Sequence, residues 1–248
     1  LPEKGFKSYI ITSGGQLLKF IKKEKVKVIR LPVHSKNPIL ILLNTIIIIF
    51  VILILNVDIV HARSRAPAWS CLWACFITRR KFVTTFHGTY NYSNKIKKFY
   101  NSVMVKSKLT IAGSNFIFDH ISENYQEYLN KKNKLMVVFR GINLEYFNKK
   151  NISENKKDKL ISEWNIDTEK FTLLLPGRLT PWKGQEMFIE ALNILIEDYN
   201  KYNYQAIILG SDQGRNVYSK KLLSLSQRYG LNKKIKFVSH QEHMPLAY

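Results

Sequence analysis

Residues 171–196 read FTLLLPGRLTPWKGQEMFIEALNILI, a stretch with the pattern of a strand, a turn and a helix. The apolar run that opens it predicts a buried strand, and the spacing of its later apolar residues predicts a helix. The turn is bounded by Gly177 and Gly184 and carries Arg178 and Lys183. Free N–H groups at a helix start favour anions, and two fixed cations beside them suit a diphosphate. The same spacing also fits an ordinary loop with solvated cations, so spacing alone leaves both interpretations open.

Predicted strands and helices alternate along the rest of the chain as well. Strands are predicted at 7–12, 26–31, 57–61, 81–86, 109–112, 135–139, 171–176, 205–209 and 235–238, with helical patterns between them. Strands that alternate with helices form parallel sheets covered on both faces, so the predicted fold class is α/β. A glycine-containing connection at 140–143 and a polar stretch at 148–159 interrupt the series. We therefore expect two domains, 1–147 and 148–248.

Ligands of such sheets bind beyond the carboxyl ends of the strands. His87 ends an apolar strand and precedes a loop with room for a ligand, where a neutral imidazole can bond to a sugar hydroxyl or a carbonyl. A histidine that bonds only to its own loop is the alternative. Other polar and glycine residues at predicted strand ends are candidates for donor or acceptor loops, namely Arg63, Gly88, Ser114, Gly210 and Asp212.

The composition is that of a packed protein with a cationic first part. The chain has 248 residues, 46% of them hydrophobic, and a formal net charge of +21. Residues 1–150 hold 25 Lys+Arg against 7 Asp+Glu, whereas residues 151–248 hold 14 against 11. A cationic half suits an anionic membrane or a polyanionic substrate, or reflects a Lys-rich composition without a role. No nucleic-acid recognition module accompanies the charge, so a nucleic-acid partner is not expected.

Residues 37–55 form the one strongly apolar segment. From 39 to 55 only Asn44 and Thr45 are polar, which is at the short limit for a membrane span. A helix buried between a sheet and another surface has the same composition. We favour the buried helix, because a span would cut the strand–helix series in two, while partial insertion into a membrane stays open.

Several motifs and sites are not supported. The sequence lacks the G-x-G-x-x-G, P-loop, H-E-x-x-H and G-x-S-x-G patterns. His240 and His243 have no third ligand nearby in sequence, so no metal site is expected. Cys71 and Cys75 lie beside tryptophans, which favours a buried helix face over a redox pair. With no secretory signal, we expect a cytoplasmic protein.

Seven short segments together resemble one family. They are residues 61–70 (HARSRAPAWS), 84–90 (TTFHGTY), 100–104 (YNSVM), 111–114 (IAGS), 140–143 (RGIN), 176–185 (PGRLTPWKGQ) and 213–215 (QGR). The chain resembles group 1 glycosyltransferases of the bacterial envelope and lipopolysaccharide type. The resemblance implies the GT-B fold, two facing Rossmann-like domains with a nucleotide sugar between them.

The resemblance also implies roles for matching residues. Arg178 and Lys183 would bind the donor diphosphate, and Gly177 and Gly184 would let the backbone approach it. His87 would hydrogen-bond the donor and position the anomeric centre. Such enzymes are usually retaining and need no metal or cofactor. A lipid-linked or polysaccharide acceptor, at the cytoplasmic face of an anionic membrane, fits the basic first domain.

The sequence departs from the family at both ends. The first strand and its glycine loop, which normally precede 7–12, are not in it, and neither is the Glu-x7-Glu segment that follows 248 in the family. We expect a chain truncated at both ends, with an incomplete second domain, that is a glycosyltransferase or an inactive or split piece of one. The alternatives are a nucleotide-sugar epimerase of the same fold and a non-catalytic basic membrane-associated protein.

Overall fold

The computed structural model describes residues 4–21, 25–90, 92–129, 133–197, 199, 203–214 and 216–248. The chain divides into two compact units, Leu1–Gly141 and Ile142–Tyr248. This division falls a few residues before the 147/148 boundary expected from sequence. Residues 142–147 group with the second unit because the Tyr146 ring contacts His243 and the Phe147 ring contacts Tyr248.

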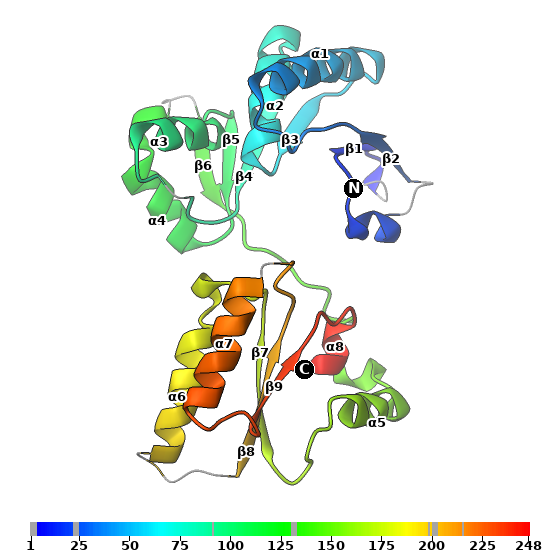
Figure 1. The fold of residues 1–248 in the computed structure, drawn as a ribbon. Coiled ribbons are helices and arrows are strands. Elements are labelled where there is room, and N and C mark those ends of the chain that lie inside the picture. Colours follow the sequence, from blue (N-terminus) through cyan, green and yellow to red (C-terminus); the bar gives the residue numbers. More distant parts are fainter. Residues whose placement is uncertain are drawn as a thin grey trace. The chain divides into compact units, whose positions relative to one another are not determined.

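The first unit contains two parallel sheets (Figure 1). A two-stranded sheet pairs β1 with β2, and a four-stranded sheet has the order β3-β4-β5-β6. The strands are β1 (Ser8–Thr12), β2 (Val26–Arg30), β3 (Ile59–Ala62), β4 (Lys81–Phe86), β5 (Leu109–Ala112) and β6 (Lys134–Val137). A cavity of about 580 Å³ is lined by residues of both β1 and β3. The parallel pairing confirms the predicted α/β class.

Among the described residues of this unit, four α-helices connect these strands. They are α1 (Pro38–Ile54), α2 (Arg65–Thr78), α3 (Lys95–Ser102) and α4 (Asn115–Asn124), with 3-10 turns at Gln16–Phe20, Val103–Val105 and Gln126–Tyr128. The core between helices and sheet includes fully buried Phe86, Met104, Ile121 and Tyr125. Cys71 and Cys75 are buried free thiols, and burial raises the pKa of each to about 12. Both thiols therefore stay protonated, as the prediction of a buried helix face requires.

Helix α1 is buried on one face only, so the expectation of a sandwiched helix is wrong for the other face. It begins after Asn37, whose Oδ1 accepts a hydrogen bond from the Ile39 N–H at 2.9 Å. Its inner face packs on α2, where the Ser70 hydroxyl donates to the Ile41 carbonyl. Its outer face has large apolar side chains in solvent, including Leu42 at 62% exposed and Phe50 at 59%. Among the described residues, no helix has the length and apolarity needed to cross a membrane.

The second unit is a three-stranded parallel sheet with helices on both sides (Figure 1). The strands β7 (Phe171–Pro176), β8 (Tyr204–Leu209) and β9 (Ile235–Val238) lie in the order β7-β8-β9. The central strand β8 is buried along its whole length. The helices are α5 (Glu154–Glu163), α6 (Gln185–Glu197), α7 (Asn216–Arg228) and α8 (Met244–Ala247), with 3-10 turns at Lys149–Asn151 and Pro181–Lys183.

Candidate functional site

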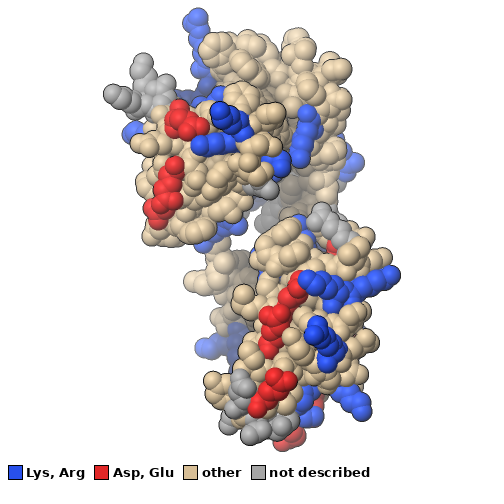
Figure 2. Space-filling view, turned by 60° about the vertical axis from the view of Figure 1, so that its left-hand side comes forward, with Lys and Arg blue, Asp and Glu red and all other residues tan. Residues whose placement is uncertain are grey.

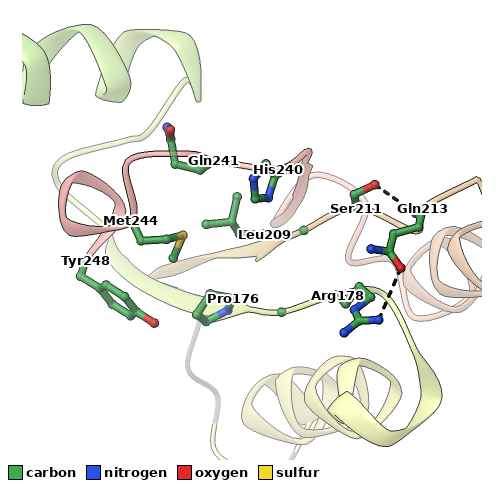
Figure 3. Close-up of a pocket in the computed structure, with 11 residues that line it drawn as sticks. Pro176, Arg178, Leu209, Ser211, Gln213, His240, Gln241, Met244 and Tyr248 are labelled. Atoms are coloured by element: carbon green, nitrogen blue, oxygen red, sulfur yellow. Dashed lines mark hydrogen bonds between the residues drawn. The ribbon is translucent and has the colours of Figure 1, made fainter. Parts of the chain in front are cut away.

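A pocket of about 400 Å³ lies beyond the carboxyl ends of the three strands of the second unit (Figure 3). Arg178 and Gln213 lie at one end of it, and Met244 and Tyr248 lie at the other. The pocket is lined by Pro176, Gly177, Arg178, Leu209, Gly210, Ser211, Gln213, His240, Gln241, Met244 and Tyr248. This is the edge at which parallel α/β sheets bind ligands.

Two glycines allow the loops beneath this pocket to pack backbone against backbone. Gly210 has φ +155°, and a Cβ atom there would lie 2.0 Å from the Gly177 carbonyl oxygen. The Gly177 N–H donates to the Leu209 carbonyl at 2.8 Å. Only glycine fits position 210, because any side chain would push the two loops apart.

Arg178 and Lys183 belong to the same loop. The Arg178 side chain is exposed and donates through Nη1 to the Gln213 Oε1 atom at 3.4 Å. The Lys183 stem runs along Gly177, since a Cβ at Gly177 would meet Lys183 Cγ and Cδ at 3.8 Å. Among the described residues, neither cation forms an ion pair with a carboxylate. Gly184 ends the turn with φ +76°, and α6 begins directly after it.

In the first unit, three side chains meet at the carboxyl ends of β3, β4 and β6. Arg140 Nη2 lies 2.6 Å from His87 Nδ1, and Arg63 Nε lies 3.3 Å from His87 Nε2. Only one of these two ring nitrogens can accept a hydrogen bond from its guanidinium in a given tautomer. The Arg140 guanidinium lies over Gly113, where a Cβ would be 3.6 Å from its Nε atom. The His87 ring therefore contacts side chains that follow β3 and β6, so the alternative of a histidine that bonds only to its own loop is wrong.

The electrostatics of this cluster keep His87 neutral. Burial lowers the pKa of His87, and the charges of Arg140 and Arg63 lower it further. Desolvation and then Arg63 also lower the pKa of His61, whose Nε2 lies 2.7 Å from the Thr85 hydroxyl. At pH 7 the His87 ring is thus a neutral imidazole with one donor and one acceptor nitrogen.

Comparison with known proteins gives the family. The model of glycosyltransferase family 4 matches residues 1–146, and that of the group 1 glycosyl transferases matches residues 156–248. The chain belongs to glycosyltransferase family 4. Among curated proteins no significant match was found.

Solved structures support the fold of this family 4 chain. A glycosyltransferase from Rickettsia africae is 36% identical with a TM-score of 0.82, over 99% of this chain and 63% of that one. Anabaena Alr3699/HepE in complex with UDP and glucose is 18% identical with a TM-score of 0.77, over 99% and 65%. WaaG, a glycosyltransferase involved in lipopolysaccharide biosynthesis, is 13% identical with a TM-score of 0.62, over 99% and 65%. The family 4 chain thus has a GT-B fold and spans just under two thirds of these proteins.

Other predicted site residues of the family 4 chain have local structural roles. Asp212 holds a turn, since its Oδ1 accepts from the Gly214 N–H at 3.0 Å and its Oδ2 accepts from the Ser219 hydroxyl at 2.8 Å. Ser114 caps α4 by accepting from the Ile117 N–H. Gly88 has open space around the position of a Cβ. Arg215, part of the 213–215 motif, lies outside the described residues.

The sequence did not reveal several residues that line the pocket of the family 4 chain or hold its loops. Gln185 is fully buried, and its Nε2 donates to the Arg178 carbonyl at 3.0 Å, which fixes the loop. His240 and Tyr248 line the pocket, while the His243 ring packs on Tyr146. Within the described part of the chain, no cluster of three or more His, Cys, Asp or Glu residues could hold a metal ion. In the sequence, His240 could have been recognised as a pocket residue by its position just after the carboxyl end of β9.

Proposed function

We propose that this chain is the catalytic part of a retaining glycosyltransferase that transfers a sugar from a nucleotide-sugar donor to an acceptor of the bacterial envelope. The observation that carries the proposal is the loop of Arg178 and Lys183 at the edge of a pocket, two cations that form no ion pair with a carboxylate among the described residues. Binding of UDP by the HepE structures, which share the fold, supports a nucleotide donor.

The donor diphosphate would lie at this loop. Charge-assisted hydrogen bonds contribute about 1.5–3 kcal/mol each, and more where they favour the charge that develops on the leaving diphosphate. Together with the N-terminus of α6, the two cations would neutralise the diphosphate without a metal ion. The rest of the pocket would take the nucleoside, with the rings of His240 and Tyr248 available to contact the base.

His87 would act next to the transferred sugar. Its neutral ring has a donor and an acceptor nitrogen, so it would hydrogen-bond a sugar hydroxyl and orient the anomeric carbon.

A lipid-linked acceptor at an anionic membrane surface fits the first unit. The outer face of α1 exposes Leu42, Phe50 and Leu53, and α2 adds the exposed rings of Trp73 and Phe76. Residues 36–106 contain ten Lys and Arg but one acidic residue. In Figure 2 the top of the first unit, where Figure 1 places α1, is largely uncharged. Apolar surface beside cations is the composition of a peripheral membrane face, which supports a reaction at the cytoplasmic side of the membrane.

Donor binding tests the proposal directly. R178A and K183A should each weaken binding of UDP, or of GDP or ADP if one of these binds more tightly, by tenfold or more. Isothermal titration calorimetry measures the affinity. The matched control is R228A, which removes an exposed arginine from the end of α7 in the same unit and should change nothing. Unchanged nucleotide binding in both R178A and K183A would refute the diphosphate site.

Family membership does not favour the two alternatives, the epimerase and the non-catalytic membrane protein. Product analysis separates the epimerase, which would isomerise a nucleotide sugar without transferring it.

A further inference from the structure

Two arginine guanidiniums lie within hydrogen-bonding distance of the two nitrogens of one imidazole. Arg140 Nη2 lies 2.6 Å from His87 Nδ1, and Arg63 Nε lies 3.3 Å from His87 Nε2. A neutral imidazole has only one acceptor nitrogen, and an imidazolium has none. The ring can therefore satisfy at most one of these two guanidinium donors, whatever its protonation state. The cluster has more donors than acceptors.

Among the described residues, the charged or titratable groups around His87 offer no negative charge to the second guanidinium. The charged or titratable groups that influence His87 are Arg140, Arg63 and His61, none of which carries negative charge. The His87 carbonyl accepts a second, longer bond from Arg140 at 3.4 Å. In the part of the chain that the structure describes, neither arginine forms an ion pair with a carboxylate.

Two other arginines of the same unit, Arg65 and Arg80, have polar partners of their own. The Arg65 guanidinium donates to Asn101 Oδ1 at 2.7 Å and lies over the Tyr90 ring, 4.4 Å from its centroid. Arg80 pairs with Asp58 and Asn56. Arg65 and Arg80 thus have acceptors outside the His87 cluster, unlike the second guanidinium at His87.

The cluster is also open to a ligand. Arg63 and Arg140 are exposed and His87 is half-buried. The side chains come from the carboxyl ends of β3, β4 and β6, and Gly113 leaves room for the Arg140 guanidinium. A planar guanidinium can donate two parallel hydrogen bonds to the oxygens of a phosphate or carboxylate, and such charge-assisted bidentate pairs are among the strong hydrogen bonds of proteins.

We propose that Arg63 and Arg140 form an oxyanion site for a phosphate or carboxylate group carried by the acceptor. The assignment to the acceptor rests on the proposed function, whereas oxyanion binding itself does not. An oxyanion on the two guanidiniums would satisfy their donors and release a ring nitrogen of His87. That nitrogen would then be free to hydrogen-bond the transferred sugar, so an anionic acceptor would help to assemble the site.

Titration of the 248-residue chain with inorganic phosphate tests the oxyanion site. The His87 ring signals, identified by their loss in H87N, report its pKa by NMR. Phosphate should raise the pKa of His87, because a bound anion favours the protonated ring. R63Q and R140Q should each weaken phosphate binding by tenfold or more and remove this response. The control R79Q takes the same charge from an exposed residue at the end of α2 and should behave as the unmodified chain.

Two results would overturn the oxyanion site. One is a His87 titration that is the same in phosphate and in sodium chloride of equal ionic strength. The other is phosphate binding in R63Q and R140Q that equals that of R79Q. Amide spectra of each variant check that the fold is retained.

Nucleotide binding identifies the source of the anion. If the oxyanion belongs to the acceptor, R63Q and R140Q should bind UDP within twofold of the unmodified chain, while R178A loses tenfold. If R63Q and R140Q lose UDP affinity as R178A does, the anion is the donor diphosphate and the assignment to the acceptor is wrong. If R178A keeps its UDP affinity, the proposed donor site fails, whereas the phosphate response of His87 still decides the oxyanion site.

Discussion

At the scale of single residues, the pair of cations at the pocket could be predicted from the sequence, whereas the contact between its two glycines could not. The cations at 178 and 183 could be found from sequence, because they follow an apolar strand and precede a helix. The close approach of Gly210 to Gly177 could not, because it depends on the parallel pairing of β7 with β8. The contacts of Arg140 and Arg63 with His87 were missed for the same reason, since they join residues 53 and 24 positions apart.

The glycine contact predicts a difference between two similar substitutions. G210A should destabilise the chain by about 1–3 kcal/mol and open the pocket, because its methyl group meets the Gly177 carbonyl. G214A, where φ is also positive but no atom lies within 4 Å, should cost only about 1 kcal/mol. Urea unfolding measures both free energies. If G210A and G214A lost the same free energy of unfolding, the contact with the Gly177 carbonyl would not be the reason why position 210 requires glycine.

At the scale of elements, sequence periodicity predicted the order and type of the strands and helices. It did not reveal that one face of α1 stays exposed. Uniformly apolar sequences give no periodic signal, so the buried face with Asn44, Thr45 and Ile48 could not be told from the outer one. The short helix α8, which brings Tyr248 to the pocket, likewise has no distinctive pattern of its own.

The exposed face of α1 predicts membrane binding that depends on its apolar side chains. L42D and F50D should each weaken binding to vesicles containing anionic lipid by tenfold or more, because each removes apolar surface and adds negative charge. Both positions are exposed, so the fold should be retained. The control is V217D, at a residue 86% exposed on α7 of the second unit.

Sedimentation with vesicles measures this binding, which should also fall as salt increases. Binding of L42D and F50D equal to that of V217D would show that α1 is not the membrane face.

At the scale of the whole molecule, the two units differ in charge in a way that matches their proposed substrates. Residues 1–141 hold 23 Lys+Arg and 6 Asp+Glu, whereas residues 142–248 hold 16 and 12. The charge asymmetry can be counted directly on the sequence. A division near residue 147 was expected because a glycine-containing connection and a polar stretch interrupt the series of strands and helices there. The boundary at 141/142 could not be predicted from the sequence, because it depends on the packing of Tyr146 and Phe147 against residues near the end of the chain.

The central claim is that the pocket beyond β7, β8 and β9 binds the nucleoside diphosphate of the donor. Amide chemical-shift mapping of the 248-residue chain with the tightest-binding of UDP, GDP and ADP tests it most directly. The account predicts shifts concentrated at residues 176–185, 209–213 and 240–248, with none along α5. Shifts confined to other segments, or no saturable shifts with any of the three nucleotides, would contradict it.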